Sequence, residues 1–209
     1  MRHSLYAEEF GIRLRPVRSD DAPFIVWLRN LEHVRGRVGD SAITVQGQEK
    51  WLATYFQRGG DYYFIAETQA GTLLGTHGIY GVQGVTGEKG RQVVRPEVLC
   101  GVPIAMLATD LAFVKLGLTQ LRSTTVISNT SVRSLHLKSG FKQVGIIPSA
   151  VTIDGRFTDL VEFLLTPEDW LKARDSLIPA AQMAGRLTLE WEASRFSRLE
   201  SWNSSRNGK

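Results

Sequence analysis

The sequence contains one cysteine, Cys100, among its 209 residues. A lone thiol cannot form a disulfide within the chain, which excludes the disulfide-stapled folds of small secreted proteins. It also excludes a zinc site rich in cysteine, and we expect the protein to use no metal.

Long apolar runs are missing as well. No stretch of about eighteen apolar residues, the minimum for a membrane-spanning helix, occurs in the chain. The first residues, MRHSLYAEEF, lack the apolar segment of a secretory signal peptide. We therefore expect a cytoplasmic protein with no membrane partner.

A strong excess of either charge is also absent. The chain has 25 Lys and Arg against 21 Asp and Glu, a net charge of +4. The basic residues are scattered, without the stripe of basic and aromatic residues that is typical of nucleic-acid binders, so we expect no nucleic-acid partner. A mildly basic surface does suit a ligand that carries several phosphates.

The sequence does contain the apolar periodicity of one mixed α/β domain, over residues 1–178. The predicted order is strand, two helices, three strands, helix, strand, helix and two strands, followed by a helix from Pro167 to about Leu177. We expect residues 179–209 to form a C-terminal extension that is partly helical or disordered, because the last residues, SWNSSRNGK, have a disordered composition.

The segment from Gln92 to Leu116 carries the first chemical signal. A polar loop over 83–90 leads into a strand over 91–96, and a helix is expected from Pro103 to about Leu116. The backbone N–H groups of a first helical turn lack partners and, with the helix dipole, attract an anion. Gly101 lets a phosphate approach the backbone closely. The pattern alone also fits an ordinary structural turn.

A second signal follows in ISNTSVRSLHLKSGF. The string N-x-S-x-x-S-L-H-x-K-x-G-F, from Asn129 to Phe141, resembles the end of the fifth strand and the fourth helix of the GNAT superfamily of acetyl-CoA-dependent N-acetyltransferases. Residues 110–126 are similar to the family's third helix and its exit. The N-terminal IRLRPVRSDDAPFIVWLRNLEHVR resembles the opening of members that acetylate amino-sugars or protein N-termini. The resemblance covers roughly Ile12 to Thr166.

This resemblance implies a GNAT-like single domain with a mostly antiparallel, twisted sheet of about seven strands, splayed between strands 4 and 5 and flanked by helices. The family's pyrophosphate signature is Arg or Gln, two residues, Gly, one residue, then Gly or Ala. Here the shorter PEVLCGV stands in its place, with Gly101 as its one glycine. The shorter loop resembles the branch that acetylates the 4-amino group of nucleotide-linked amino-sugars.

The resemblance also implies how acetyl-CoA binds. Val93 and Val94 would offer backbone hydrogen bonds to the pantetheine arm, and an N–H near Val94 would polarise the thioester carbonyl. Gly101, Val102 and Ile104 would offer N–H groups near the pyrophosphate. Contacts with the pantetheine or phosphate end would come from Asn129, Ser131 and Arg133.

Two proton transfers accompany acetyl transfer, one from the attacking amine and one to the leaving thiolate. His136 occupies the helix position at which the family often carries a Tyr as general acid. A His with a pKa near neutrality could serve there, and a structural His packed on its helix is the alternative.

The sequence signal for a general base is less specific. Glu97 and His77 are candidates, although a surface or packing role fits each of them. Alternation along the strand places His77 and Tyr80 on opposite faces, so they should not both point into one site. Cys100 lies near a helix N-terminus, which could activate a nucleophile, but the direct transfer of the family makes a covalent role unexpected.

Three functions stay open. The first is acetyl transfer to a primary amine of a small molecule, with an amino-sugar nucleotide as the leading acceptor. The second is acetylation of a protein N-terminus, of the ribosomal-protein type. The third is a non-catalytic GNAT-like module that binds an acyl-CoA or a partner protein. An aminoglycoside acceptor is disfavoured, because a polycation prefers an acidic cleft.

The C-terminal segment contains Trp191, Phe196 and Trp202. Exposed aromatic residues near a terminus often mark a contact surface. They could dock on the domain itself or on a second subunit, and a homodimer is one arrangement that the sequence allows.

Overall fold

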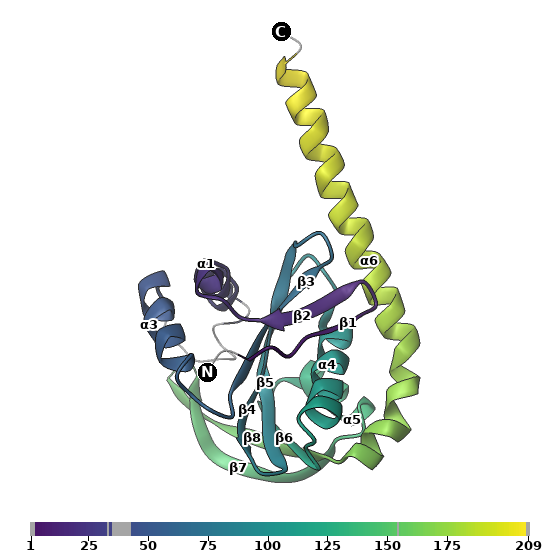
Figure 1. The fold of residues 1–209 in the computed structure, drawn as a ribbon. Helices are drawn as coiled ribbons and strands as arrows, with labels where there is room; N and C mark the ends of the chain where they lie inside the picture. The colour runs from purple at the N-terminus through teal and green to yellow at the C-terminus, as the bar shows by residue number, and fades with distance from the viewer. Residues whose placement is uncertain (1–2, 33, 35–42, 154, 208–209) are drawn as a thin grey trace.

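The computed structural model, drawn in Figure 1, describes residues 3–32, 34, 43–153 and 155–207. Its centre is one eight-stranded sheet with the spatial order β1-β2-β3-β4-β5-β6-β8-β7. Neighbouring strands are antiparallel except β5 and β6, which are parallel. This mixed, mostly antiparallel sheet confirms the predicted fold class. The strands are β1 Ala7–Glu9, β2 Ile12–Pro16, β3 Tyr62–Thr68, β4 Leu73–Gln83, β5 Thr86–Val94, β6 Gln120–Val126, β7 Lys142–Ile153 and β8 Arg156–Leu165.

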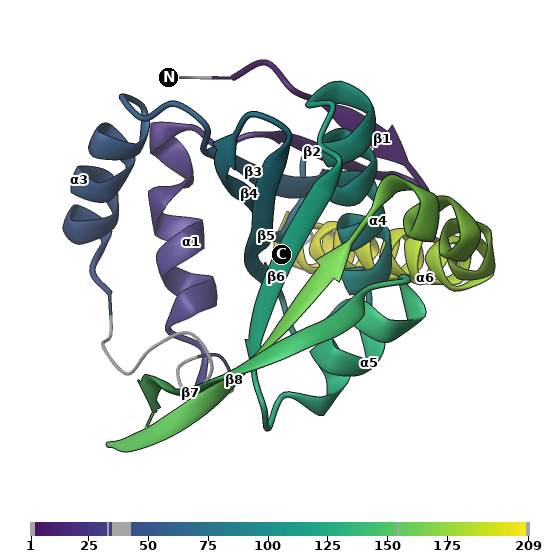
Figure 2. The same ribbon diagram turned by 90° about the horizontal axis from the view of Figure 1, so that it is seen from below.

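Helices cover both faces of the sheet. Figure 2 shows α1 and α3 on one side, and α4, α5 and α6 on the other. A 3-10 turn, Ser19–Asp21, precedes α1, and a π-helical segment, Leu111–Lys115, continues α4. Within the described residues, none of the helices has the length and apolar character needed to cross a membrane. The helices are α1 Ala22–Arg29, α3 Val45–Tyr55, α4 Gly101–Asp110, α5 Thr130–Lys138 and α6 Pro167–Asn207.

Helix α4 lies within the hydrophobic core between the sheet and α6. Its residues from Pro103 to Thr109 are all buried, as expected of a helix that is apolar on every side. The core cluster joins Ile104 of this helix to Phe163 of the sheet and Leu177 of α6. Full burial of each such large apolar side chain stabilises the fold by about 1.5–3 kcal/mol.

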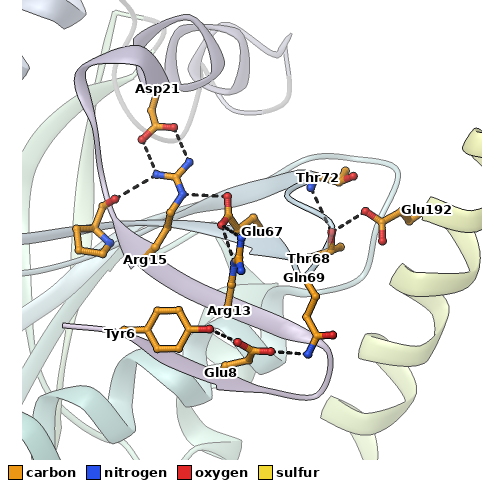
Figure 3. A network of polar contacts seen from close by, with 11 residues as sticks. Tyr6, Glu8, Arg13, Arg15, Asp21, Glu67, Thr68, Gln69, Thr72 and Glu192 are labelled. Atoms are coloured by element: carbon orange, nitrogen blue, oxygen red, sulfur yellow. Dashed lines mark hydrogen bonds and ion pairs between the residues drawn. The ribbon is translucent and has the colours of Figure 1, made fainter. Parts of the chain in front are cut away.

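A network of buried ion pairs ties the N-terminal strands together (Figure 3). Glu67 of β3 accepts hydrogen bonds from Arg13 and Arg15 of β2, with Nε–Oε distances of 2.7 and 2.9 Å. Arg15 also donates to both carboxylate oxygens of Asp21, at 2.8 and 2.7 Å. Asp21 and Glu67 are each only 4% exposed. Because a buried charge is costly when it is unpaired, these pairs fix the start of α1 against the sheet.

Helix α6 is bound to the domain from Trp170 to Glu192. Trp170 Nε1 donates to Asp110 at 2.8 Å, near the start of α6, and Thr68 Oγ1 donates to Glu192 at 2.6 Å about six turns later. Between these contacts the helix backbone closely approaches the β1–β2 turn, where a Cβ added at Gly185 would lie 2.0 Å from the carbonyl oxygen of Phe10. A glycine is therefore required at this crossing.

The structure corrects the prediction of a loop over 83–90, because Thr86 to Gly90 form the first part of β5. The short β1 adds one strand to the seven that were predicted individually, which gives eight in the described residues. A Cβ at Gly90 would lie 2.6 Å from the hydroxyl of Tyr80, and one at Gly87 would lie 2.9 Å from Leu118. These glycines allow close packing within a strand, which composition alone does not distinguish from a flexible loop.

Two helix boundaries also differ from the prediction. Helix α4 begins at Gly101 rather than Pro103, and α6 continues past Leu177 and Pro179 to Asn207. A stripe of buried residues at spacings of three and four carries α6 past the proline, so tertiary packing overrides the weak local signal. The stripe consists of Leu177, Ala181, Ala184 and Thr188.

We expect Gly185→Ala to destabilise the protein, although alanine is the better helix former by about 1 kcal/mol. The added methyl group would meet the carbonyl oxygen of Phe10, so α6 would have to move off the β1–β2 turn. The unfolding free energy, measured by denaturant unfolding, should fall by about 1–3 kcal/mol. Gly59→Ala is the matched control, because no atom lies within 4 Å of its added Cβ. A Gly185→Ala variant as stable as the wild type would contradict the close approach.

Candidate active site

The parallel strands β5 and β6 separate in the middle of the sheet. They pair only where Thr86 to Glu88 lie beside Gln120 to Arg122. Beyond these residues a cavity of about 650 Å³ opens between the strands, with further walls from α4, α5, β7 and β8. We call it the inter-strand cavity. It lies at the splay predicted between strands 4 and 5, which are β5 and β6 here because β1 adds one strand.

A bulge at Arg91 accompanies this separation. On β4 the register advances by two residues from Gly78 to Thr76, while on β5 it advances by three, from Gly90 to Val93. Arg91 takes up the extra residue with a φ of +54°, in the left-handed region that costs a non-glycine residue about 1–2 kcal/mol. A bulge bends its strand, and this one lies three residues past Glu88, where the pairing of β5 with β6 ends.

The side chain of Arg91 holds the bulge in place. Its guanidinium donates to both carboxylate oxygens of Asp61, at 2.6 and 3.1 Å. It also lies over the ring of Tyr80 at 4.2 Å and near those of Trp51 and Tyr63, at 5.4 and 5.7 Å. A bidentate ion pair and cation–π contacts together are large enough to offset the backbone strain.

Lys89 lies in the cavity wall, two residues before the bulge. Its Nζ donates to Thr109 Oγ1 of α4 at 3.0 Å and lies 5.0 Å from the ring centroid of Phe141. The residue is 5% exposed, and burial lowers the pKa of its amine to about 7.

His136, the predicted general acid, faces the cavity from α5. Its Nδ1 donates to the carbonyl of Val132 at 2.9 Å, so in the neutral ring Nε2 accepts from Ser123 Oγ, at 2.7 Å. Burial, with a contribution from nearby Lys89, lowers its pKa to about 3. The imidazole is therefore neutral near pH 7, which differs from the near-neutral pKa that the sequence argument assumed.

His77 also faces the cavity, from β4. The residue is 1% exposed, and within the described part of the chain neither ring nitrogen has a hydrogen-bond partner. Burial, and then the charge of Lys89, lowers its pKa well below 6.5. Tyr80 lies outside the cavity lining and bonds to Glu88 at 3.0 Å, so the two residues occupy opposite faces as alternation predicts.

Glu97 is not brought to the cavity. Its carboxylate accepts from Arg95 at 3.1 Å, the side chain is 42% exposed, and it is absent from the described lining. The hydrogen bond from Arg95 lowers the pKa of this carboxyl. Cys100 is fully buried, and burial raises the pKa of its thiol to about 12, which removes the basis for a nucleophilic role.

The predicted acetyl-CoA contacts divide into two groups. Val93 and Val94 of β5 and Asn129 at the start of α5 line the cavity, and Asn129 caps its helix by accepting from Val132 N at 3.3 Å. Ser131 is exposed and lies outside the described lining, as does Arg133, whose Nη1 donates to the carbonyl of Ile127 at 3.0 Å.

The remaining predicted contacts lie at the N-terminus of α4. Gly101 and Val102 form its first turn, and the preceding Cys100 makes no side-chain cap. The N–H of Ile104 already donates to the carbonyl of Cys100 at 3.2 Å, so helix formation uses the donor that we had assigned to a pyrophosphate.

Sequence reasoning missed most polar residues of this site, among them Lys89, Arg91, Thr109 and Ser123. Lys89 fell in the predicted loop, and Arg91 at its edge, because the strand's glycines were interpreted as a turn. Thr109 and Ser123 have no local signal, since their partners lie on other elements. A charged residue at an inward position of β5 would have been informative only with the strand register known.

Comparison with known proteins agrees with this architecture. A sequence model of the acetyltransferase (GNAT) domain matches residues 12–142. A spermidine N-acetyltransferase from Vibrio cholerae, solved with CoA and spermine, has a TM-score of 0.72 and 18% identity, covering 78% of this chain and 99% of that one. FdhC, a nucleotide-linked sugar GNAT in its apo form, has a TM-score of 0.70 and 22% identity, covering 87% and 99%. RimJ from Mycobacterium smegmatis, solved with CoA-disulfide, has a TM-score of 0.70 and 21% identity, covering 82% and 90%. None of the curated proteins compared matches the sequence.

We expect Arg91→Ala to destabilise the protein more than Arg91→Gly does. Both substitutions remove the guanidinium and its contacts with Asp61 and Tyr80. Only glycine adopts a φ of +54° without strain, so the alanine variant should be less stable by about 1 kcal/mol. Denaturant unfolding of both variants beside the wild type measures the difference, and equal stabilities would show that the bulge is not strained.

Proposed function

The chain belongs to the GNAT family of acetyl-CoA-dependent N-acetyltransferases, and we propose that it acetylates the primary amine of an amino-sugar nucleotide. The observation that carries the choice of acceptor is the charge of the inter-strand cavity. None of its described lining residues is Asp or Glu, whereas Lys89 is basic. The guanidinium of Arg91 is already paired with Asp61 and adds no free charge to the cavity. A polyamine would need carboxylates there, and an anionic nucleotide would not.

The described residues fit acetyl-CoA as the acetyl donor. The ladder between β5 and β6 ends at Glu88, which leaves the β6-facing edge of Val93 and Val94 available to a pantetheine arm. Helix α4 begins without a side-chain cap, so the N–H groups of Gly101 and Val102 can bind a pyrophosphate. The unpaired ring nitrogens of His77 suit a cavity wall whose hydrogen bonds a ligand completes.

Acetyl-CoA supplies a thioester, which the acceptor amine attacks directly in a ternary complex. The chain's own part is to orient the two substrates and to polarise the thioester carbonyl through a backbone N–H near Val94. His136 stays neutral and fixes Ser123 in the cavity wall. Cys100 takes no part, because its thiol is buried and protonated.

Gly101→Asp should weaken acetyl-CoA binding at least about tenfold, because a carboxylate in the first turn of α4 would repel the pyrophosphate. The side chain has room, since a Cβ at Gly101 meets only Gln92 Nε2, at 3.4 Å. Gly101→Asn has the same shape without the charge and should lose less affinity. Isothermal titration with acetyl-CoA measures all three proteins. No binding by the wild type at millimolar acetyl-CoA would overturn the enzyme function and favour a module that binds another partner.

The acceptor is tested by assaying a panel of candidate amines at saturating acetyl-CoA. A thiol reagent detects the CoA that each reaction releases. We expect turnover with a nucleotide-linked 4-amino-sugar and none with spermidine, because the cavity offers a polycation no described carboxylate. Turnover of a peptide with a free N-terminus, without turnover of the sugar nucleotide, would assign the protein to N-terminal acetylation instead.

A further inference from the structure

The inter-strand cavity contains a buried lysine that has no acidic partner among the described residues. Lys89 makes its described hydrogen bond with Thr109 Oγ1, at 3.0 Å. The hydroxyl of Thr109 donates its own hydrogen to the carbonyl of Ala105 at 2.7 Å, so toward Lys89 it can only accept. Burying an amine in this way opposes folding, because the charged form loses its hydration. Such a group in a ligand cavity is a candidate for catalysis.

The other titratable groups around Lys89 cannot exchange a proton near pH 7. His77 from β4 and His136 from α5 face it, and burial keeps both rings neutral. The guanidinium of Arg91 is bound to Asp61, and a guanidinium does not release its proton in proteins. The elements packed against Lys89 otherwise present Thr109 from α4 and the ring of Phe141, which carry no charge. Among the described cavity residues, Lys89 is thus the group able to gain and lose a proton, and burial lowers its pKa to about 7.

We propose that Lys89 Nζ donates the proton that the coenzyme A sulfur takes up during acetyl transfer, an inference that rests on the proposed function. The acceptor nitrogen forms a bond to the acetyl carbon, the carbon–sulfur bond breaks, and its electron pair remains on sulfur. Lys89 Nζ gives one proton to that sulfur. The proton lost by the acceptor nitrogen restores the ammonium, so the enzyme ends as it began.

Thr109 is a positioning residue in this step. It holds Nζ by one hydrogen bond, and the other hydrogens of the ammonium have no hydrogen-bond partner among the described residues. Because Thr109 lies in the buried part of α4, and α4 also presents its first turn to the pyrophosphate, one helix sets both ends of the donor site. The absence of a described carboxylate beside Lys89 keeps the proton available to a thiolate.

The first test uses the thiol of bound CoA and needs no acceptor. In the wild-type complex, ultraviolet thiolate absorbance followed against pH should begin to rise at least about one pH unit lower than it does for free CoA. The thiol and Lys89 titrate as a coupled pair, in which thiolate and ammonium favour each other's charged form. Lys89→Met, which nearly preserves shape, should restore the pKa of free CoA or raise it. Thr109→Val keeps the lysine and should give an intermediate value, so that the test stands even where Lys89→Met folds poorly.

Lys172→Met is the matched control, because this lysine is exposed on α6 and pairs only with Glu168 in the described structure. Its complex should show the thiol pKa of the wild type. Equal thiol pKa values in wild type and Lys89→Met would overturn the role of Lys89. Calorimetric titration of the same proteins with acetyl-CoA separates that failure from failure of the proposed function, which would appear as no binding by the wild type.

The second test is the pH dependence of turnover with an active acceptor. A required ammonium at Lys89 predicts that kcat of the wild type falls as the pH rises through the pKa of this group in the complex. Lys89→Met should lower kcat by about 10²–10⁴-fold, with the KM for acetyl-CoA little changed, and its profile should lack the alkaline fall. A Lys89→Met profile that keeps this alkaline fall would contradict the proposal.

Discussion

The bulge beside the inter-strand cavity depends on the side chain of Arg91. A non-glycine residue with a φ of +54° is stable in the middle of a strand only when its surroundings over-determine it. Asp61 and the ring of Tyr80 do so from one face of the sheet. The cavity and the buried Lys89 lie just past Glu88, where the pairing of β5 with β6 ends. The Arg91–Asp61 ion pair, on one face of the sheet, thus holds the bulge that borders the inter-strand cavity.

The elements with strong periodicity could be predicted from the sequence, because burial of one face dictates their pattern. The strand β2, with Ile12 and Leu14 buried, and the helix α3, with Leu52 and Tyr55 buried, follow this rule closely. Two features could not be predicted from this rule. The glycines of β5 serve close packing rather than a turn, and α6 continues through Pro179 because Ala181 and Ala184 are buried against the domain. Each exception depends on a neighbour that is distant in the sequence.

The candidate site also had one part that the sequence could predict, the positions of its residues, and one part that it could not, their chemistry. Val93, Asn129 and the two histidines His77 and His136 reach the cavity because strand alternation and helix spacing are local properties. Their chemistry is not local: the low pKa of His136 arises from burial and from Lys89, a residue on another element. Glu97 also illustrates this limit, since its position after β5 suited a catalytic base but Arg95 holds it at the surface.

The 41 residues of α6 give it a length of about 60 Å, roughly twice the diameter of a small domain. Figure 1 shows its last turns projecting beyond the sheet, at the opposite end from α5. A dye or a surface tether attached to those turns would therefore lie beyond the sheet, at the opposite end from α5, which lines the cavity. The protein carries its own helical spacer, by which a sensor chip or a single-molecule measurement could hold it.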